Sequence, residues 1–407
     1  MDRQTNTVVH VGAMIDGTGA DPVRDVFISI SDGKIESIST DGPRDPGGLV
    51  VDAREKTVLP GLIDCHVHLC SDPVPDIAAR ALGESEAMTV LRGVRNAEKT
   101  LRSGVTTVRN VGTRADLDLD LDRAIREGIV AGPRIVGAGR VICVTGGHGH
   151  FMGLEADGPE AIRHAVRTLV KRGSQVIKLT ITGGISTPGT RYGRPLMSRE
   201  EIGAAVDEAH RLERKVCVHA QGWEAITDAV AVGVDSIEHG FFRGPDDPNL
   251  AVMRERGIYL VPTLITYDMV VKYGVAGGIP AEAVAKAERA VEEHRRSFAW
   301  AVDAGVPIAM GSDAGTEYND HGTNPGELAY MVRYSAMTPM DAIVASTKSA
   351  AKLLGIDGWV GAIQAGQTAD LLAVSGDPLR DVSVVEDPSW VMKGGAMVRR
   401  DAAPMPR

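Results

Sequence analysis

Eight short apolar runs alternate with segments of helical pattern along the middle of this 407-residue chain. Parallel strands need a crossover connection that is usually a helix, so the alternation favours a parallel sheet wrapped by helices. Eight such units predict a (β/α)8 TIM barrel over residues 61–360. An open doubly wound sheet is the alternative, but no Gly-x-Gly-x-x-Gly opens a helix after the first run. The eight runs are residues 62–66, 106–111, 134–138, 176–181, 215–219, 236–239, 259–264 and 307–310.

Helical patterns separate several of these runs. They cover residues 85–103, 159–172, 198–214 and 281–304, and Ser198 with Glu201 forms a capping-box signature at the start of one of them. Residues 338–354 are expected to form the last outer helix.

Short β-rich runs with turn signals occupy both ends of the chain. They lie within residues 8–52 and again within 369–398. Because a closed barrel brings its two ends near each other, the two groups can meet in one unit. We therefore predict a small β-sandwich domain built from residues 1–60 plus 361–407, which contains no chemistry-bearing motif.

Composition and charge exclude several classes of function. The net charge of −10 argues against a nucleic-acid or anionic-membrane surface. The first residues lack the basic start and apolar run of a secretory signal, and no apolar stretch is long enough to span a bilayer, so we expect a cytoplasmic protein. The four cysteines form no Cys-x-x-Cys pair, which argues against a disulfide framework or a thiolate zinc site.

The segment Pro-Gly-Leu-Ile-Asp-Cys-His-Val-His ends the first barrel run. His66 and His68 are two residues apart, so on a strand their side chains point to the same side and could bind one metal ion. A pair of hydrogen-bonded histidines near a strand end explains this short motif equally well.

Other polar residues stand at the ends of later runs. In a (β/α)8 barrel the active site lies at the C-terminal ends of the strands, so these positions favour a functional role. His219, His239 or Asp313 alone has a simple structural explanation, but burying all of them without partners would cost several kcal/mol, which a metal ion would offset.

Lys178 lies inside the apolar run Val-Ile-Lys-Leu-Thr-Ile. A buried ammonium must be paired, neutralised or chemically altered. A salt bridge to Asp313 or Asp64 is one solution. The other is a carbamate, formed when a neutral lysine amine takes up carbon dioxide, and the nearby histidines favour it.

Five motifs, in order, resemble the amidohydrolase superfamily, in particular its imidazolonepropionase-like and prolidase-like metal-dependent hydrolases. The residues are Pro-Gly-Leu-Ile-Asp-Cys-His66-Val-His68, Val-Ile-Lys178, Val-His219-Ala, Ile-Glu-His239-Gly and Gly-Ser-Asp313-Ala-Gly, followed by Gly-Ala-Ile-Gln-Ala-Gly-Gln-Thr-Ala-Asp-Leu-Leu at 361–372. The resemblance covers nearly the whole chain.

This resemblance implies two divalent metal ions, most often Zn2+. His66, His68 and Asp313 would hold one ion, His219 and His239 the other, and carboxylated Lys178 would bridge them. Paired cations lower the pKa of a shared water and supply hydroxide, and Asp313 would pass the proton to the leaving amine.

Mouth-loop residues are expected to contact the substrate. The resemblance makes His148 of the Gly146–His150 loop a catalytic and substrate contact that donates to the oxyanion, with His150 beside it. Arg191 and Tyr192, or His321 on the last mouth loop, could bind substrate or be ordinary surface residues. Prolidase-like members are expected to carry a carboxylate-binding tyrosine two residues past His219, and here that residue is Gln221, so strict recognition of a carboxy-terminal dipeptide is not expected.

The sequence therefore predicts a hydrolase of a small-molecule amide, such as a dipeptide, an N-acyl amino acid or a related amide. A cyclic amide, carbamate or lactone hydrolase is the alternative. A non-catalytic scaffold of the same fold is disfavoured because all six ligands are present, and a single-metal deaminase would not need Lys178. Large barrels often pair, so a homo-oligomer is also expected.

Overall fold

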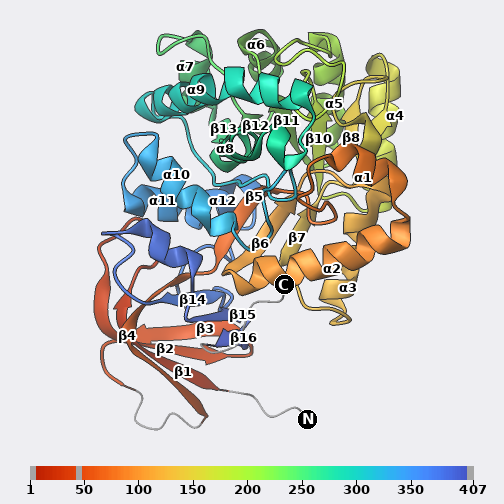
Figure 1. Ribbon diagram of the computed structural model, residues 1–407. Coiled ribbons are helices and arrows are strands. Elements are labelled where there is room, and N and C mark those ends of the chain that lie inside the picture. Colours follow the sequence, from red (N-terminus) through yellow and green to blue (C-terminus); the bar gives the residue numbers. More distant parts are fainter. Residues whose placement is uncertain (1–5, 43–47, 401–407) are drawn as a thin grey trace.

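The computed structural model describes residues 6–42 and 48–400. It consists of a β-sheet at one end and a larger part in which helices surround parallel strands (Figure 1). The portions of the predicted β domain at residues 1–5, 43–47 and 401–407 lie outside the described residues.

Strands from both ends of the chain form one seven-stranded sheet with the order β16-β15-β14-β4-β1-β2-β3. β4 pairs antiparallel with β14, which joins the N-terminal strands to the C-terminal ones. The strands are β1 (Thr7–Met14), β2 (Val23–Ser31), β3 (Lys34–Ser39), β4 (Leu49–Pro60), β14 (Leu371–Val374), β15 (Trp390–Lys393) and β16 (Ala396–Arg400).

This sheet curls around its own apolar side chains. The Ile35 N–H of β3 donates to the Gln367 carbonyl at 2.8 Å, so the far edge of the sheet meets the segment before β14. Val11, Ile28 and Leu371 lie in the same buried cluster. A curled sheet covers a small core from both sides, so the predicted two-sheet sandwich is corrected to one continuous sheet in the described part of the chain.

The parallel strands form two sheets. One has the order β5-β6-β7 and the other β13-β12-β11-β10-β8-β9. Their members are β5 (Leu62–Val67), β6 (Val105–Asn110), β7 (Arg134–Gly137), β8 (Val141–Cys143), β9 (Gly153–Glu155), β10 (Val176–Thr180), β11 (Lys215–Ala220), β12 (Ser236–His239) and β13 (Tyr259–Val261).

Backbone hydrogen bonds connect the two parallel sheets at both edges. On one side, Gln175, directly before β10, donates to the carbonyl of Gly137 in β7 at 2.8 Å. On the other side, Ala309 donates to Leu260 of β13 at 3.1 Å, and Cys65 of β5 donates to Met310 at 2.8 Å.

Residues 307–310, predicted to be the eighth strand, therefore lie between β13 and β5 but form one isolated bridge, between Ile308 and Leu260, instead of a ladder. Gly311 lies so close to β5 that a Cβ there would be 2.8 Å from the Cβ of His66. The chain then bends at Asp313, whose φ is +59°. A continuous strand cannot pass through such a bend.

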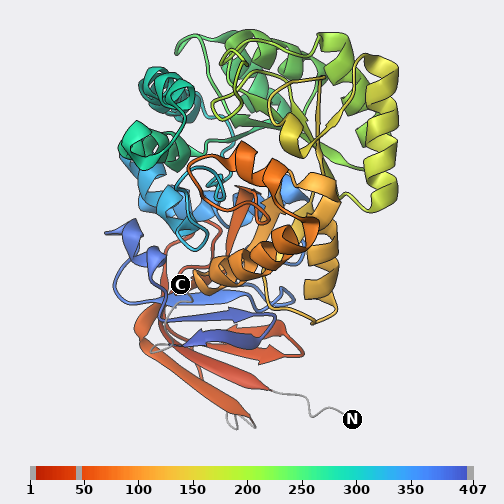
Figure 2. The same ribbon diagram turned by 45° about the vertical axis from the view of Figure 1, so that its right-hand side comes forward.

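Helices cover the outside of the parallel strands (Figures 1 and 2). The predicted capping box is confirmed: Ser198 accepts from the backbone of Glu201, and the Glu201 side chain accepts from the backbone of Ser198. The helices are α1 (Ile77–Gly83), α2 (Glu86–Arg102), α3 (Leu117–Arg126), α4 (Pro159–Arg172), α5 (Arg199–Arg211), α6 (Trp223–Val232), α7 (Pro248–Arg256), α8 (Leu264–Tyr273), α9 (Ala281–Asp303), α10 (Glu327–Arg333), α11 (Pro339–Ala345) and α12 (Lys348–Leu354).

The single helix predicted over residues 338–354 is wrong, because the chain forms two helices there. Ser346 and Thr347 separate them, and both hydroxyls donate to the carbonyl of Ile343. Side chains that bond to the preceding turn compete with helix continuation, and Thr347 has non-helical torsions. None of the helices in the described ranges combines the length and apolarity needed to cross a bilayer.

Candidate active site

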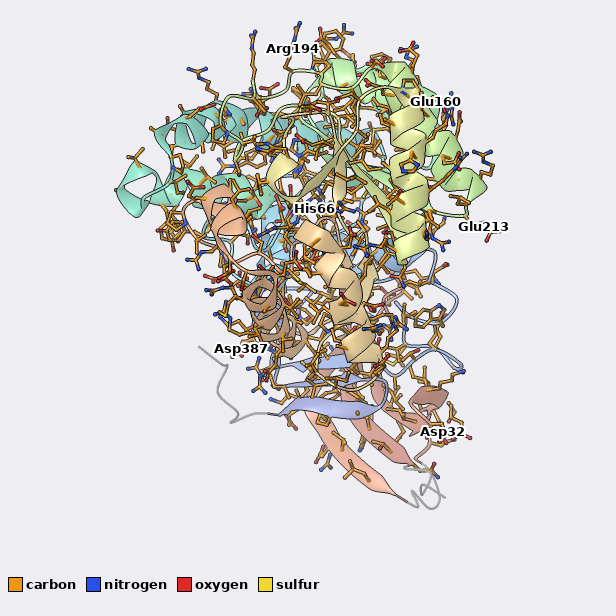
Figure 3. The ribbon with its side chains drawn as sticks, turned by 90° about the vertical axis from the view of Figure 1, so that its right-hand side faces the viewer. Asp32, His66, Glu160, Arg194, Glu213 and Asp387 are labelled. Carbon is orange, nitrogen blue, oxygen red and sulfur yellow. The ribbon has the colours of Figure 1, made fainter. Side chains whose placement is uncertain are left out.

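The C-terminal ends of the parallel strands surround a cavity in the larger part of the molecule. His66 of β5, Lys178 of β10, His219 of β11 and His239 of β12 line it, together with Asp313 from the segment after the bridge. Figure 3 shows His66 in the interior of the molecule. The five side chains come from distant parts of the sequence, and all are less than 10% exposed.

Five histidine rings follow one another around this cavity. The ring centroid of His66 lies 5.5 Å from that of His68 and 5.1 Å from that of His239. His239 is followed by His219 at 4.5 Å, and His219 by His148 at 4.4 Å. The structure thus brings together the four histidines predicted as ligands and His148, one of the three histidines predicted to contact the substrate.

Asp313 faces two of these rings. Its Oδ1 lies 3.4 Å from Nε2 of His66 and 3.3 Å from Nε2 of His68, while Thr266 donates to Oδ2 at 3.3 Å. Burial alone would raise the pKa of Asp313, but the two imidazoles lower it below its usual range. The backbone N–H of Asp313 donates to the His66 carbonyl at 2.7 Å, which fixes the carboxylate against β5.

His66 is oriented by an acidic residue that the sequence reasoning missed. Its Nδ1 lies 2.7 Å from Oε2 of Glu238, whose Oε1 accepts from Arg109 at 2.8 Å. Burial works against ionisation of Glu238, yet the Arg109 guanidinium and His66 lower its pKa to about 2. The buried carboxylate therefore stays charged and holds the His66 ring with Nε2 toward the cavity.

His68 and His239 are held in the same way by neutral oxygen atoms. Nδ1 of His68 lies 3.1 Å from the carbonyl oxygen of Gly112. Nδ1 of His239 lies 2.7 Å from the Thr263 hydroxyl oxygen. In each ring the second nitrogen remains available to the cavity.

Lys178 and His219 differ from these residues. Neither Nζ of Lys178 nor Nε2 of His219 has a hydrogen-bond partner in the described structure, although both atoms are buried. Burial lowers the pKa of Lys178 and favours its neutral amine. Burial, and then the neighbouring His148 and His239, lower the pKa of His219 well below its ordinary value. The salt bridge between Lys178 and Asp313 or Asp64, considered as an alternative, is not formed.

His148 enters the cavity from the glycine-rich loop. Its Nδ1 lies 2.8 Å from Oγ1 of Thr187, and that oxygen also accepts from the backbone of Gly149. Burial and the nearby Lys178 lower the pKa of His148 to about 3, so its imidazole is neutral. His150, two residues on, is exposed, binds the Gly147 carbonyl and does not line this cavity.

Gln221 lines the cavity beyond His219. Its Nε2 donates to the Tyr267 hydroxyl at 2.5 Å, while its Oε1 is buried without a partner among the described residues. Tyr267, at the start of α8, was not predicted, because nothing in its local sequence distinguishes it. Its ring centroid lies 6.5 Å from that of His239.

The other predicted substrate contacts lie outside the cavity lining. Arg191 is exposed, and Figure 3 shows its neighbour Arg194 at the outer edge of the molecule. Tyr192 packs edge-on against Phe241. His321 is buried, with Nε2 3.0 Å from the Ser71 carbonyl oxygen, and burial lowers its pKa to about 4.

Glu317 lies behind the cavity wall. Its Oε2 accepts from the hydroxyl of Ser186, a lining residue, at 3.0 Å. Burial raises the pKa of Glu317 to about 7. The Glu317 carboxyl group therefore contacts the Ser186 hydroxyl from the side away from the cavity.

The donor set at the strand ends fits a metal ion. His66, His239 and Asp313 each offer a ligand atom, and these atoms lie within 4.8 Å of one another. Imidazole and carboxylate donors are typical zinc ligands. The cluster could therefore hold a metal ion, and the unpartnered Lys178 and His219 lie in the same cavity.

Comparison with known proteins gives concordant results. The amidohydrolase family model matches residues 57–398. The ochratoxinase of Aspergillus niger is 28% identical over 436 aligned residues, which cover 98% of this chain and 88% of that protein. A solved Xaa-Pro dipeptidase with methionine bound in its active site has a TM-score of 0.89 and 34% identity, covering 97% of this chain and 99% of that one. A prolidase in complex with N-methylphosphonate-L-proline has a TM-score of 0.91 and 30% identity, covering 98% and 100%. The resemblance found in the sequence is thereby confirmed.

Proposed function

Because the chain belongs to the amidohydrolase family, we propose that it is a metal-dependent hydrolase that cleaves the C–N bond of an amide. One observation carries the proposal: Lys178 Nζ and His219 Nε2 are buried without partners beside the His66, His239 and Asp313 cluster. A buried polar atom without a partner costs roughly 1–3 kcal/mol. A binding site accounts for that cost, because its ligand completes the missing contacts.

We assign two divalent ions, most simply Zn2+, to this set of side chains. His66, His68 and Asp313 would hold one ion, and His219 and His239 the other. The low pKa of His219 keeps its ring nitrogen unprotonated and able to coordinate. The neutral amine of Lys178 would add to carbon dioxide with loss of a proton, and the resulting carbamate has two oxygens that can bridge two ions.

When bound, the ions would polarise the scissile carbonyl and lower the pKa of water enough to supply hydroxide near neutral pH. Asp313 takes the proton of the attacking water and delivers it to the leaving nitrogen. Its lowered pKa keeps the carboxylate ionised, as a metal ligand must be. Thr266, which donates to Oδ2, holds the carboxylate in place during the transfer.

His148 stabilises the developing oxyanion in this proposal. The Thr187 oxygen accepts from Gly149 and can give its own proton to Nδ1 of His148. The neutral ring then carries its hydrogen on Nε2, where it can donate to the substrate oxygen. A donor of this kind contributes on the order of 10²-fold to the rate.

The substrate is a small-molecule amide. The ochratoxinase and the Xaa-Pro dipeptidase among the relatives support this class. The test is metal analysis followed by a screen of zinc-loaded protein against dipeptides, N-acyl amino acids, N-acyl amides, imidazolones, carbamates and lactones. We expect turnover of acyclic amides. Turnover of only cyclic amides, carbamates or lactones, or of no compound in the screen, would overturn the proposal.

We also propose that residues 61–360 form a closed (β/α)8 barrel and that residues 1–60 plus 361–407 form the companion β domain. The hydrogen bonds of Gln175 with Gly137, and of Cys65 with Met310, support closure at the two edges. A cytoplasmic location, the absence of nucleic-acid and membrane partners, and homo-oligomer formation stay predictions.

A further inference from the structure

A side-chain pair, Gln221 and Tyr267, closes the cavity beyond the histidines. Both residues line the cavity and both are buried. Tyr267 approaches the His239 ring to 6.5 Å between centroids, and Gln221 is two residues from His219. The pair therefore adjoins the reacting centre assigned above.

The pair, which lines the cavity, leaves one acceptor and one donor uncommitted. Gln221 Nε2 donates to the Tyr267 oxygen at 2.5 Å, so the phenol proton of Tyr267 remains free to donate elsewhere. Gln221 Oε1 is buried and unpartnered within the described ranges. A carboxamide or peptide unit offers the complementary N–H and C=O, whereas a carboxylate offers acceptors only.

The charges around the cavity oppose a carboxylate as well. Among the described lining residues, Lys178 is the one that carries a basic amine or guanidinium, and the proposed function uses its nitrogen for the metal bridge. Arg191 is exposed and outside the lining. A substrate carboxylate would thus enter a site whose described lining offers no free lysine or arginine to pair with it.

We propose that this enzyme hydrolyses amides whose leaving amine carries a neutral carboxamide next to the scissile nitrogen, rather than a free carboxylate. The inference rests on the proposed function and names its substrate class: N-acyl amino acid amides and internal peptide-like bonds. Water adds to the acyl carbon, the C–N bond breaks, and the nitrogen takes the proton. The products are a carboxylic acid and an amine that keeps its carboxamide.

Three substrates that share the acyl group and the amino acid test this assignment. One ends in a carboxamide, the second in a methyl ester, which is neutral but has no N–H, and the third in a free carboxylate. We expect kcat/KM of the zinc-loaded enzyme to be at least roughly tenfold higher for the carboxamide than for the ester, as one hydrogen bond allows. The free acid should be slower than the ester. A free acid that is hydrolysed as fast as the carboxamide would overturn the inference.

Substitutions test whether Gln221 and Tyr267 cause the preference for a carboxamide. Gln221→Leu should reduce the carboxamide-to-ester ratio to near unity, whereas Gln364→Leu, at an exposed position of the β domain, should keep the wild-type ratio. Tyr267→Phe should lower kcat/KM for the carboxamide and for the ester alike, because both substrates offer a carbonyl oxygen to the donor that is lost. An unchanged ratio in a folded Gln221→Leu enzyme contradicts the inference. If Gln221→Leu does not fold, the three substrates with wild-type enzyme decide alone.

Different results contradict the proposed function and the preference for a carboxamide. Zinc-loaded protein that hydrolyses no amide at all refutes the proposed function. Protein that hydrolyses free-acid amides in preference to carboxamides keeps the proposed function and refutes this inference.

Discussion

The two sides of the cavity differ in how the protein completes its own polar contacts. On the side of β5 and β12, His66 is held by Glu238, Glu238 by Arg109, and His68 by the carbonyl of Gly112. On the side of β10 and β11, Lys178 and His219 have buried nitrogens with no partner in the described structure. Folding alone therefore satisfies these polar groups on the side of β5 and β12, which we call the self-completed side. On the side of β10 and β11, the incomplete side, a ligand is required to satisfy the two nitrogens.

This difference predicts opposite effects of substitution. On the self-completed side, a change should lower stability, because it leaves a buried charge alone. On the incomplete side, a change should remove activity with little loss of stability, since the buried nitrogen makes no hydrogen bond within the described structure. The following experiments measure both quantities on both sides.

The largest effect is expected at Lys178. Lys178→Met keeps an unbranched apolar side chain one atom shorter and removes the nitrogen, so we expect activity to fall by at least about 10³-fold, or ~4 kcal/mol in transition-state free energy. The metal-free variant should unfold at a urea concentration equal to or higher than the wild type, because an unpartnered buried amine is lost. Lys171→Met, on the exposed face of α4, is the matched control. A Lys178→Met enzyme with near-normal turnover would refute the proposed bridge.

Metal removal should give a comparable loss of activity. Treatment with a strong chelator is expected to abolish turnover, and zinc with bicarbonate should restore more of it than zinc alone, because the Lys178 carbamate must form again. His219→Ala should reduce the zinc content measured by atomic absorption, whereas His164→Ala, at an exposed position of α4, should not. Equal recovery with and without bicarbonate would argue against the carbamate.

Glu238 tests the self-completed side. Glu238→Gln leaves the buried Arg109 guanidinium without its charge partner, and breaking a buried pair in this way costs about 3–5 kcal/mol. The free energy of unfolding in urea should fall by that amount. The exposed pair of Asp52 and Arg54 provides the control, since Asp52→Asn should change stability by less than about 1 kcal/mol. Similar effects of the two substitutions would show that Glu238 has no special role.

The sequence was most informative where a single rule acts over a short range. Strand spacing, together with the rule that barrel sites lie at strand ends, was enough to select five residues that line one cavity in the structure. They are His66, Lys178, His219, His239 and Asp313. The same argument that singled out Lys178, a charge inside an apolar strand, applies to Arg109 and Glu238. Applied to both, it would have predicted their ion pair.

Other features had no such signal. Tyr267 reaches the cavity from the start of a helix, and its role depends on where that helix docks. Whether His150 or His148 enters the cavity depends on a turn at Gly149, with φ of +77°. Both outcomes are set by tertiary packing, which a local pattern does not contain. The bend after residue 310 likewise depends on the positive φ of Asp313, next to the close approach of Gly311 to His66.

The smallest effect concerns Glu317 on the incomplete side. Its pKa is raised to about 7 by burial, with Asp313 and Asp76 acting in the same direction. In the unfolded chain a glutamate titrates near 4.3. The folded protein therefore binds more protons between these pH values, and the contribution of Glu317 to stability must fall as pH rises through this window.

Glu317→Gln removes that dependence. The free energy of unfolding of the variant minus that of the wild type should increase between pH 5 and pH 8, by up to about 3 kcal/mol from the linkage relation. Glu200→Gln, at an exposed position in the first turn of α5, should follow the wild type over the same range. A difference that stays constant with pH would mean that Glu317 does not keep its proton in the folded protein, and the acid behind Ser186 would then carry full charge throughout.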